Sequence, residues 1–439
     1  MKYVEQIKSF LLAFLVFLSI TLTLLIWNYK PEYELIEETQ VEEVLISEPK
    51  QMQDVLRPYR VLYRQNDLFT GTVSNSVLNE LYRHLITWQV SDLEIDSNIS
   101  DVRMNEIVRT NNRATLFFNE EIPLQTFSNV LTFYNKDLLP DASFTRLIID
   151  WSTLEEQDQL QLLFLNTEKR LLFRGYIDLQ SNQRFLAKII EPAKQYTSYT
   201  EIERDSLRSL YVVQDPIEAT QYTYLDEELS LDSFKNIVFT NPSIVQRNIE
   251  SPQSEKYSDD MSWMQVDTQN KILNYVNYLA ESIAPIPSTN LIFDSFEYVN
   301  EHGGFTSDFR LSSMNVGKHI IEYQLFLHGY PVYSNITTSI ITTWGENRLF
   351  RYRRPYYSIE SDVPNERLVK NLPSGEMVVD YVRNSEDYNF EEVDEIVMGY
   401  HLIQNPDAYI FDPSWFVISN NDLTRITPDQ LGGVMNGLE

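Results

Sequence analysis

The chain contains no cysteine in its 439 residues. Disulfide bonds, catalytic thiolates and cysteine-ligated metal centres are therefore excluded, and so is a lipoprotein anchor, which needs a cysteine to acylate. The absence is compatible with an exported protein, because a domain of this size can be stabilised by its hydrophobic core alone.

Glycine and histidine are scarce as well. With only 12 glycines in the chain, a glycine-rich phosphate-binding loop is not expected. Ser312–His319 contains a Gly-Lys pair, but it lacks the first glycine and the Ser or Thr that such a loop needs. The five histidines show no H-E-x-x-H spacing, and no G-x-S-x-G or EF-hand pattern occurs. We predict no catalytic residues, no metal and no cofactor, and therefore no enzyme.

Positive charge is in short supply. The chain has 35 lysines and arginines against 64 aspartates and glutamates, and its formal net charge is −29. A surface this acidic repels nucleic acid, and we interpret it as a solvated face. Paired carboxylates serve glycoside hydrolysis, but so many acids create adjacent pairs such as Asp259-Asp260 and Glu391-Glu392 by chance. A wall hydrolase is the alternative, and it would need two facing carboxylates in a cleft.

One long apolar run lies near the amino terminus. Phe10–Trp27 contains eighteen residues without a charge. As a helix it would be about 27 Å long, close to the ~30 Å hydrocarbon core of a bilayer. Lys2 and Lys8 precede the run and an acidic segment follows it, so the positive-inside rule places the amino terminus in the cytoplasm. We predict a single-pass protein of the cell membrane with an extracellular bulk.

A cleaved signal peptide is the alternative for this segment. Signal peptides usually have a shorter apolar region that ends at small residues of the A-x-A type. Here the run ends in Trp27 and is followed by Asn28, Tyr29, Lys30 and Pro31, which offer no such site. An uncleaved anchor is therefore the favoured interpretation.

Small residues recur along the predicted anchor. Ser9 with Ala13, and Ser19 with Thr23, have the small-x-x-x-small spacing that lets membrane helices approach closely. The hydroxyls of Ser19 and Thr23 would also reach a neighbouring helix. The alternative is a plain anchor in which these small residues are incidental. We take the four residues as a candidate partner-binding face.

The rest of the sequence predicts an α+β fold. Its 43% hydrophobic and 23% charged residues are typical of a chain that buries a core. We expect an elongated, multi-domain ectodomain of small antiparallel sheets packed with helices. The predicted segments are 1–30 (cytoplasmic end and transmembrane anchor), 31–55 (acidic stalk), 56–180 (N-terminal ectodomain), 181–287 (central domain) and 288–439 (C-terminal domain of two helix-plus-sheet units).

Hydrophobic periodicity predicts the elements within these segments. Helices are predicted at 74–89, 124–131, 182–194, 232–238, 270–284, 290–300 and 374–382. Strands are predicted at 59–65, 114–118, 144–151, 160–165, 170–178, 210–214, 221–225, 308–316, 319–328, 336–344, 395–402 and 413–418. Gly329-Tyr330-Pro331-Val332 is predicted to turn the chain from one strand into the next.

Three stretches carry a family resemblance. They are the anchor and stalk (KSFLLAFLVFLSITLTLLIWNYKPEYE), the segment IIEYQLFLHGYPVYS (Ile320–Ser334) and the tail YIFDPSWFVI (Tyr409–Ile418). Together with the layout of anchor, acidic stalk and β-rich segments, they resemble the YycH family of regulatory proteins. The resemblance covers the whole chain.

The resemblance implies a function that the residue patterns do not show. YycH proteins work with the related membrane protein YycI to adjust a sensor histidine kinase, called YycG or WalK, which controls cell-wall metabolism in Gram-positive bacteria. The C-terminal helix-plus-sheet units resemble PepSY-type modules, with Gly329–Tyr333 as a strand turn. The family is not known as enzymes, so no catalytic residues carry over.

Two mechanisms follow as hypotheses. In the first, the anchor helix packs beside the kinase's own membrane helices and biases a two-state arrangement. In the rival, the protein is an extracellular binding or inhibitory module that acts on the kinase's sensor loop, a wall ligand or a wall hydrolase, and the helix is only a tether. Assembly into a homo-oligomer is a further possibility that the sequence leaves open.

Overall fold

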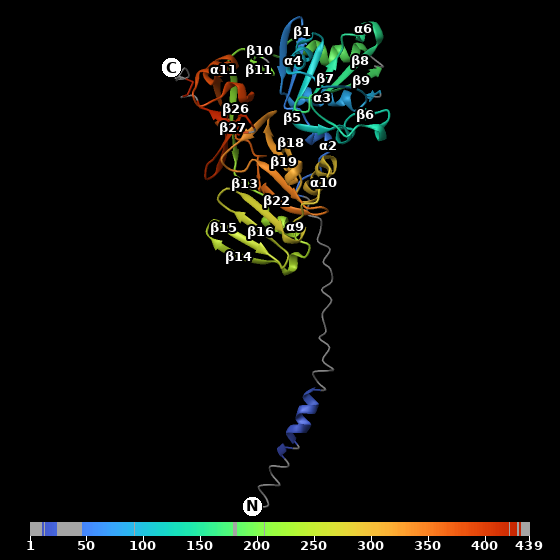
Figure 1. Cartoon of the computed structure of the whole chain (residues 1–439). Helices are drawn as coiled ribbons and strands as arrows, with labels where there is room; N and C mark the ends of the chain where they lie inside the picture. The colour runs from blue at the N-terminus through green and yellow to red at the C-terminus, as the bar shows by residue number, and fades with distance from the viewer. Residues whose placement is uncertain are drawn as a thin grey trace, which may run out of the picture. The chain divides into compact units, whose positions relative to one another are not determined.

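A computed structural model describes residues 11–12, 14–23, 46–91, 93–178, 182–205, 207–420, 422–427 and 430–431 (Figure 1). The chain divides into two compact units, Met1–Val44 and Leu45–Glu439. In the first unit, residues 11–12 and 14–23 are helical and their side chains are exposed. None of the helices in these described ranges is both long and apolar enough to cross a bilayer. The predicted anchor, Phe10–Trp27, extends beyond the described residues at both ends.

The second unit begins with a nine-stranded sheet in which every pair of neighbouring strands is antiparallel. Its strands, in spatial order, are β11 (Leu210–Val213), β10 (Thr197–Ile202), β2 (Leu68–Thr72), β1 (Arg60–Gln65), β5 (Arg113–Pro123), β7 (Ser143–Asp150), β8 (Gln159–Asn166), β9 (Leu171–Asp178) and β4 (Glu94–Ser97). We call residues 46–213 the N-terminal part.

Helices cover both faces of this sheet because its strands alternate apolar side chains between the faces. On β8, Leu162 and Phe164 join the main core with Leu78 of α3 (Asn75–Leu85). Leu163 points to the other face and packs with Met104 of α4 (Asp101–Arg109). The remaining elements of this part are α2 (Met52–Val55), α5 (Leu124–Phe127), α6 (Leu154–Gln157), α7 (Asn182–Phe185), a π-helical turn (Leu186–Ile190), α8 (Glu191–Ala193) and the paired strands β3 (Gln89–Val90) and β6 (Thr132–Phe133).

A larger sheet forms the C-terminal part, residues 217–427. Its strands, in spatial order, are β14 (Gln246–Ser251), β15 (Ser254–Ser258), β16 (Ser262–Asp267), β17 (Ile272–Asn277), β22 (Leu349–Pro355), β21 (Ser339–Trp344), β19 (Ile320–Leu327), β20 (Tyr330–Tyr333), β25 (Val393–Gln404), β26 (Ala408–Ser419), β12 (Ile217–Leu225) and β24 (Leu368–Leu372). Two more strands lie off this path: β18 (Asp308–Asn315) pairs with β19, and β27 (Asp422–Ile426) pairs with β26. The pairing of β20 with β25 is parallel, whereas all the others are antiparallel. This arrangement confirms the predicted α+β class with mostly antiparallel sheets. The sheets are not small, as predicted, because segments far apart in the sequence pair into sheets of nine and fourteen strands.

Three helices accompany the larger sheet. α9 (Leu231–Val238) precedes β14, and α10 (Ser288–Glu301) is followed by the antiparallel strands β18, β19, β21 and β22. α11 (Gly375–Asn384) is likewise followed by β25, β26 and β27. All three helices were predicted from their periodicity, and so was the order of one helix followed by antiparallel strands. A short pair, β13 (Glu227–Glu228) with β23 (Tyr357–Ser358), completes the part.

The predicted helix at 270–284 was wrong. The segment forms strand β17, which pairs with β16 and β22, followed by a 3₁₀ turn at Tyr278–Ala280. Leu273 and Tyr275 are buried on one face of the strand, a period-2 pattern. Ile283, the last residue of the supposed apolar stripe, is 95% exposed. The i, i+4 spacing of Ile272 and Val276 places both residues on one face of a strand as well as on one face of a helix.

Two predicted segments are divided differently in the structure. Residues 46–55, the end of the predicted stalk, belong to the folded unit, where the Lys50 amide donates to Asn300 Oδ1 of α10 over 3.0 Å. The segment 181–287 contributes β10 and β11 to the N-terminal sheet, and β12 and β14–β17 to the C-terminal sheet. The part of the predicted stalk before residue 46 lies outside the described residues.

Candidate functional site

The predicted partner-binding face lies partly outside the described residues. Ser9 and Ala13 are not among them. Ser19 and Thr23 lie one turn apart on the helical residues 14–23, and both side chains are exposed. The Thr23 hydroxyl donates to the Ser19 carbonyl over 2.8 Å within the same helix, so in this structure its proton is not directed at a neighbouring helix.

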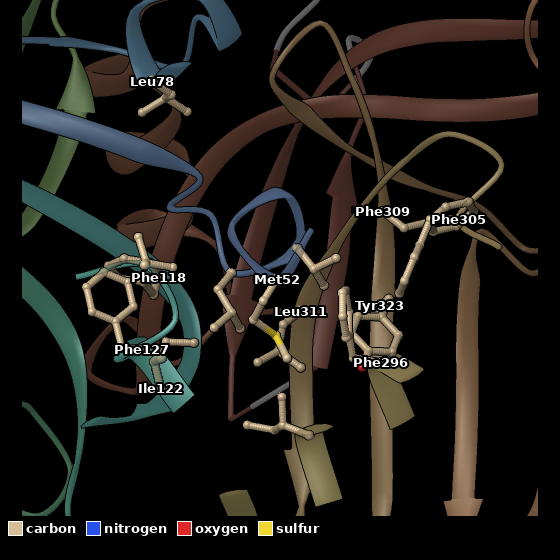
Figure 2. Packing of buried hydrophobic residues seen from close by; sticks show 14 of the residues in the cluster. Met52, Leu78, Phe118, Ile122, Phe127, Phe296, Phe305, Phe309, Leu311 and Tyr323 are labelled. Atoms are coloured by element: carbon tan, nitrogen blue, oxygen red, sulfur yellow. The ribbon is translucent and has the colours of Figure 1, made fainter. Parts of the chain in front are cut away.

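The strongest structural feature of the second unit is the junction between its two parts, and one half of that junction is apolar. Met52 of α2 lies beside Leu311 of β18, with Phe118 and Ile122 of β5 on one side and Phe296 of α10 on the other (Figure 2). These residues from both parts belong to one continuous buried cluster. We call this contact the apolar junction.

A buried arginine borders the apolar junction. Arg310 of β18 is fully buried, and its Nη1 donates to the Pro58 carbonyl over 3.1 Å. Its Nη2 donates to Asn75 Oδ1 at the start of α3 and to Asp308 Oδ2 over 2.8 Å. Burial alone would raise the pKa of Asp308, but the adjacent guanidinium and the amide of Asn75 hold it below its usual range. Arg310 therefore ties β18 to two segments of the N-terminal part.

The other half of the junction is charged and is centred on Glu395 of β25. Tyr59 Oη donates to Glu395 Oε1 over 2.8 Å, Arg60 Nη2 lies 3.2 Å from Oε2, and Arg146 Nη2 lies 3.3 Å from Oε1. All three partners come from the N-terminal part. The guanidinium carbons of both arginines lie over the Phe117 ring, 4.4 and 4.5 Å from its centroid. We call this cluster the polar junction.

The titration of these groups reflects their burial. Removal from water disfavours the charged form of Arg60, but the negative charge of Glu395, the neighbouring Tyr59 and Tyr199 and the hydrogen bond to Glu395 together outweigh that effect, and the pKa of Arg60 is raised. Burial, reinforced by the negative charge of Glu395, also raises the pKa of Tyr59. Tyr59 is therefore a neutral hydrogen-bond donor at physiological pH, and Arg60 stays charged.

A hairpin turn forms a third contact between the parts. His328 and Gly329 connect β19 to β20, with φ angles of 51° and 89°. Positive φ at both central residues is typical of the type I′ turn, which fits the twist of an antiparallel hairpin. A Cβ atom on Gly329 would collide with the carbonyl oxygen of Val73 in the N-terminal part. The prediction of a turn at Gly329–Val332 holds only for Gly329, because Tyr330, Pro331 and Val332 already belong to strand β20. The glycine permits close approach of the two parts.

A cavity of about 470 Å³ lies between these contacts. The N-terminal part contributes the start of α3 and residues of β1, β2, β10 and β11. The C-terminal part contributes the His328–Pro331 turn and residues of β25 and β26. Its lining residues include Arg60, Tyr199, His328, Tyr330, Met398 and Trp415.

Sequence reasoning missed the junction because its partners are hundreds of residues apart. Glu395 lies 335 positions after Arg60 and 249 after Arg146. One local signal was present: Arg60 interrupts an otherwise apolar start of a predicted strand, a place where an arginine needs a buried partner. The irregular register of β25 between Val393 and Glu395 is a second cause, because a bulge redirects a side chain in a way that a period-2 pattern does not predict.

The described residues at this junction show no candidate metal site. Within the described ranges, no group of three or more His, Asp or Glu side chains is placed to hold a metal ion. Asp259, one of the adjacent acids noted in the sequence, accepts hydrogen bonds from the amides of Met261 and Ser262 and shapes the turn between β15 and β16. The geometry provides two sheet-based parts that are joined by the apolar junction, the polar junction and the hairpin turn.

Comparisons with known proteins identify the family to which this fold belongs. A family model described as the YycH protein N-terminal domain matches residues 5–196, and one described as the YycH protein C-terminal domain matches residues 207–431. The chain belongs to the YycH family.

Two relatives illustrate the match. A curated protein of Bacillus subtilis (strain 168), named "Two-component system WalR/WalK regulatory protein YycH", is 20% identical over 457 aligned positions that cover 99% of each chain. A crystal structure of YycH from Bacillus subtilis superimposes with a TM-score of 0.72 and 16% sequence identity. It covers 87% of this chain and 98% of the crystallised chain. At such low identity the structural likeness establishes the fold alone.

Proposed function

We propose that this chain is a non-enzymatic regulator of a WalK-type sensor histidine kinase that controls cell-wall metabolism, and that it acts together with a YycI-like membrane protein. The observation that carries the proposal is the end-to-end match to a relative named as a regulatory protein of the WalR/WalK system. Both family models, which together span most of the chain, support the same assignment.

The proposal includes a membrane anchor at residues 10–27. The eighteen uncharged residues of Phe10–Trp27 and the lysines before them favour a single pass with the amino terminus in the cytoplasm. The large ectodomain is then extracellular in a Gram-positive bacterium. A protein arranged in this way reaches a kinase through the membrane or from outside the cell.

The anchor supplies one route of control. Ser9, Ala13, Ser19 and Thr23 form the face that would pack beside the kinase's membrane helices. A coupling free energy of ~1–3 kcal/mol between two kinase states changes their ratio by about 5- to 150-fold. The ectodomain supplies the second route, through direct contacts outside the membrane. The α10 and α11 units, each a helix followed by antiparallel strands, are the PepSY-like modules of this proposal.

Retrieval of the kinase from membranes tests the proposal. The full chain and a variant lacking residues 1–30 are each used to capture partners from detergent-solubilised membranes of the host. Retrieval by the full chain alone assigns the contact to the anchor, and retrieval by both assigns it to the ectodomain. Failure of both forms to retrieve a kinase contradicts the proposal and favours the alternative, an extracellular module that binds a wall ligand or wall hydrolase.

A substitution in the anchor distinguishes a partner-binding helix from a plain tether. We expect Ser19→Leu combined with Thr23→Leu to weaken kinase control, measured with a reporter gene that the kinase drives, because the larger side chains prevent close helix packing. Thr21→Leu, two positions away and on another face of the helix, is the control and should leave the reporter unchanged. Equal reporter activity in all three proteins would show that the anchor is only a tether.

A further inference from the structure

The cavity at the junction differs in charge from the rest of the protein. The chain has 64 acids among 439 residues. None of the 21 residues that line this cavity is an aspartate or a glutamate, and Arg60 is the one permanently charged residue among them. All 21 lie in the described ranges. The lining of this cavity therefore lacks the acidic residues that are frequent in the rest of the chain.

Arg60 contributes positive charge to the wall of the cavity. The residue is only 3% exposed, its Nη1 donates to the Tyr211 carbonyl over 2.9 Å, and its Nη2 faces Glu395. Its Nε has no hydrogen-bond partner, which is unusual for a buried guanidinium. Glu395 is also shared with Arg146, so one carboxylate faces two guanidinium groups. This corner of the cavity therefore carries excess positive charge.

The start of α3 adds a second polar contribution to the wall. Ser74, Asn75 and Ser76 line the cavity, and Asn75 and Ser76 are the first two residues of the eleven-residue helix. The Ser74 hydroxyl makes no capping hydrogen bond and instead pairs with the Ser76 hydroxyl at 2.9 Å. Backbone amides at a helix amino terminus favour negative charge.

Much of the remaining lining is apolar or aromatic. Val212, Val213 and Met398 are buried aliphatic residues, and Tyr199, Tyr330 and Trp415 supply rings. Ligand pockets in proteins typically combine such walls with a few polar groups that orient the ligand. The volume of about 470 Å³ lies within the range of such pockets, ~300–1,000 Å³.

We propose that this cavity binds a small organic anion, a carboxylate or phosphate on a planar apolar body, with the anionic group facing Arg60 and the start of α3. The ligand would contact both parts of the ectodomain at once and so stabilise their junction. Binding itself does not presuppose the role in kinase regulation, so its failure would leave that proposal standing.

Titration calorimetry with two matched probes tests this inference. The full-length protein in detergent is titrated with 2-naphthoate and with its uncharged counterpart 2-naphthamide, and protein-free micelles serve as the blank. We expect naphthoate to bind at least about tenfold more tightly, since its carboxylate is attracted by a buried guanidinium and the amide is not. Equal affinity for the two probes, or no binding of naphthoate, would overturn the inference.

Two substitutions locate the site, and one of them is designed to leave the fold intact. Arg60→Met should abolish the preference for naphthoate, although it also disturbs the polar junction. Ser76→Glu places a carboxylate at an exposed position in the first turn of α3, where helices tolerate acids. It should weaken naphthoate binding by about tenfold and leave naphthamide unaffected.

The control for Ser76→Glu is Ser233→Glu, the same change in the first turn of α9, which does not line the cavity. This variant should bind both probes like the wild type. An unchanged naphthoate affinity in Ser76→Glu, or an equal loss in Ser233→Glu, would show that the anion does not occupy this cavity.

Discussion

The two halves of the junction use opposite chemistry for the same task. At the apolar junction, Met52 of α2 and Leu311 of β18 share one core with Phe118 and Ile122 of β5. At the polar junction, a single carboxylate, Glu395, holds two arginines and a tyrosine of the other part. Both connect segments that are distant in the sequence, and both are largely shielded from water.

The two contacts have different effects: one holds the parts together and the other fixes their orientation. Hydrophobic contact is non-directional, and its free energy scales with the area buried, so the apolar junction supplies adhesion. Hydrogen-bonded charges are directional, and a misplaced partner leaves a buried charge unpaired at a cost of several kcal/mol. The polar junction therefore selects one orientation among those that the apolar contact would allow.

Placing a charge in the apolar junction should have the largest effect. We expect Leu311→Asp to lower the free energy of unfolding by more than about 4 kcal/mol, because Leu311 is 2% exposed and a carboxylate there has no partner. Leu138→Asp, at a position that is 78% exposed, is the control and should change it by less than about 0.5 kcal/mol. Chemical denaturation measures both. Similar values for the two variants would show that the shared core does not hold the parts together.

Removing the charge of Glu395 should have the next largest effect. Glu395→Gln keeps the shape of the side chain but leaves Arg60 and Arg146 without a carboxylate, and we expect a loss of about 3 kcal/mol. Glu297→Gln on the exposed side of α10 is the matched control and should cost less than about 0.5 kcal/mol. Adding Arg60→Met to Glu395→Gln should recover part of the loss. A double variant that loses the full sum of both single changes would argue against coupling across the junction.

The hairpin contact should be sensitive to added volume, because Gly329 is buried against the N-terminal part. Gly329→Ala forces a Cβ toward the Val73 carbonyl at a positive φ angle, so we expect a loss of about 1–3 kcal/mol. Gly317→Ala, in a turn where the added Cβ would meet nothing closer than 3.7 Å, is the comparison and should be nearly neutral. Thermal unfolding of the two variants checks this expectation. Equal melting temperatures would mean that the turn does not press against the N-terminal part.

The smallest effect concerns pH and lies away from the junction. Burial lowers the pKa of His302, which stacks on Tyr298, so the folded protein favours the neutral ring. The unfolded chain binds a proton near pH 6.5, and stability therefore falls as the pH drops below that value. We expect His302→Phe to reduce this fall between pH 7.5 and 5.5, measured by denaturation at each pH. An unchanged slope would show that His302 does not contribute to the pH dependence.

Regular periodicity allowed much of the fold to be predicted from the sequence. The helix at 74–89 was recognisable from Val77, Leu81, Leu85 and Trp88, and the observed helix α3 covers Asn75–Leu85. The strand at 319–328 was recognisable from alternating apolar residues and is observed as β19. The helix predicted at 270–284 failed because a spacing of four residues fits both periods, and pairing with β16 and β22 decided the outcome.

The junction was beyond sequence reasoning for a physical reason. Patterns along the chain report which face of an element is buried, but not which distant element covers it. Nothing near Glu395 in the sequence points to Arg60 or Arg146. Met52 was assigned to a stalk because residues 31–55 are acidic and contain Pro31 and Pro49. The segment Ile320–Ser334 was singled out for its family resemblance, and the structure places its turn against Val73.

Kinase activity in a reconstituted membrane tests the proposed regulatory role most directly. A WalK-type kinase is incorporated into proteoliposomes with and without the full-length protein, and its rate of autophosphorylation is measured. We expect the rate to change by at least about fivefold, in either direction, which corresponds to the lower end of typical coupling free energies. An unchanged rate, with both proteins folded and present in the same vesicles, would contradict a direct regulatory role.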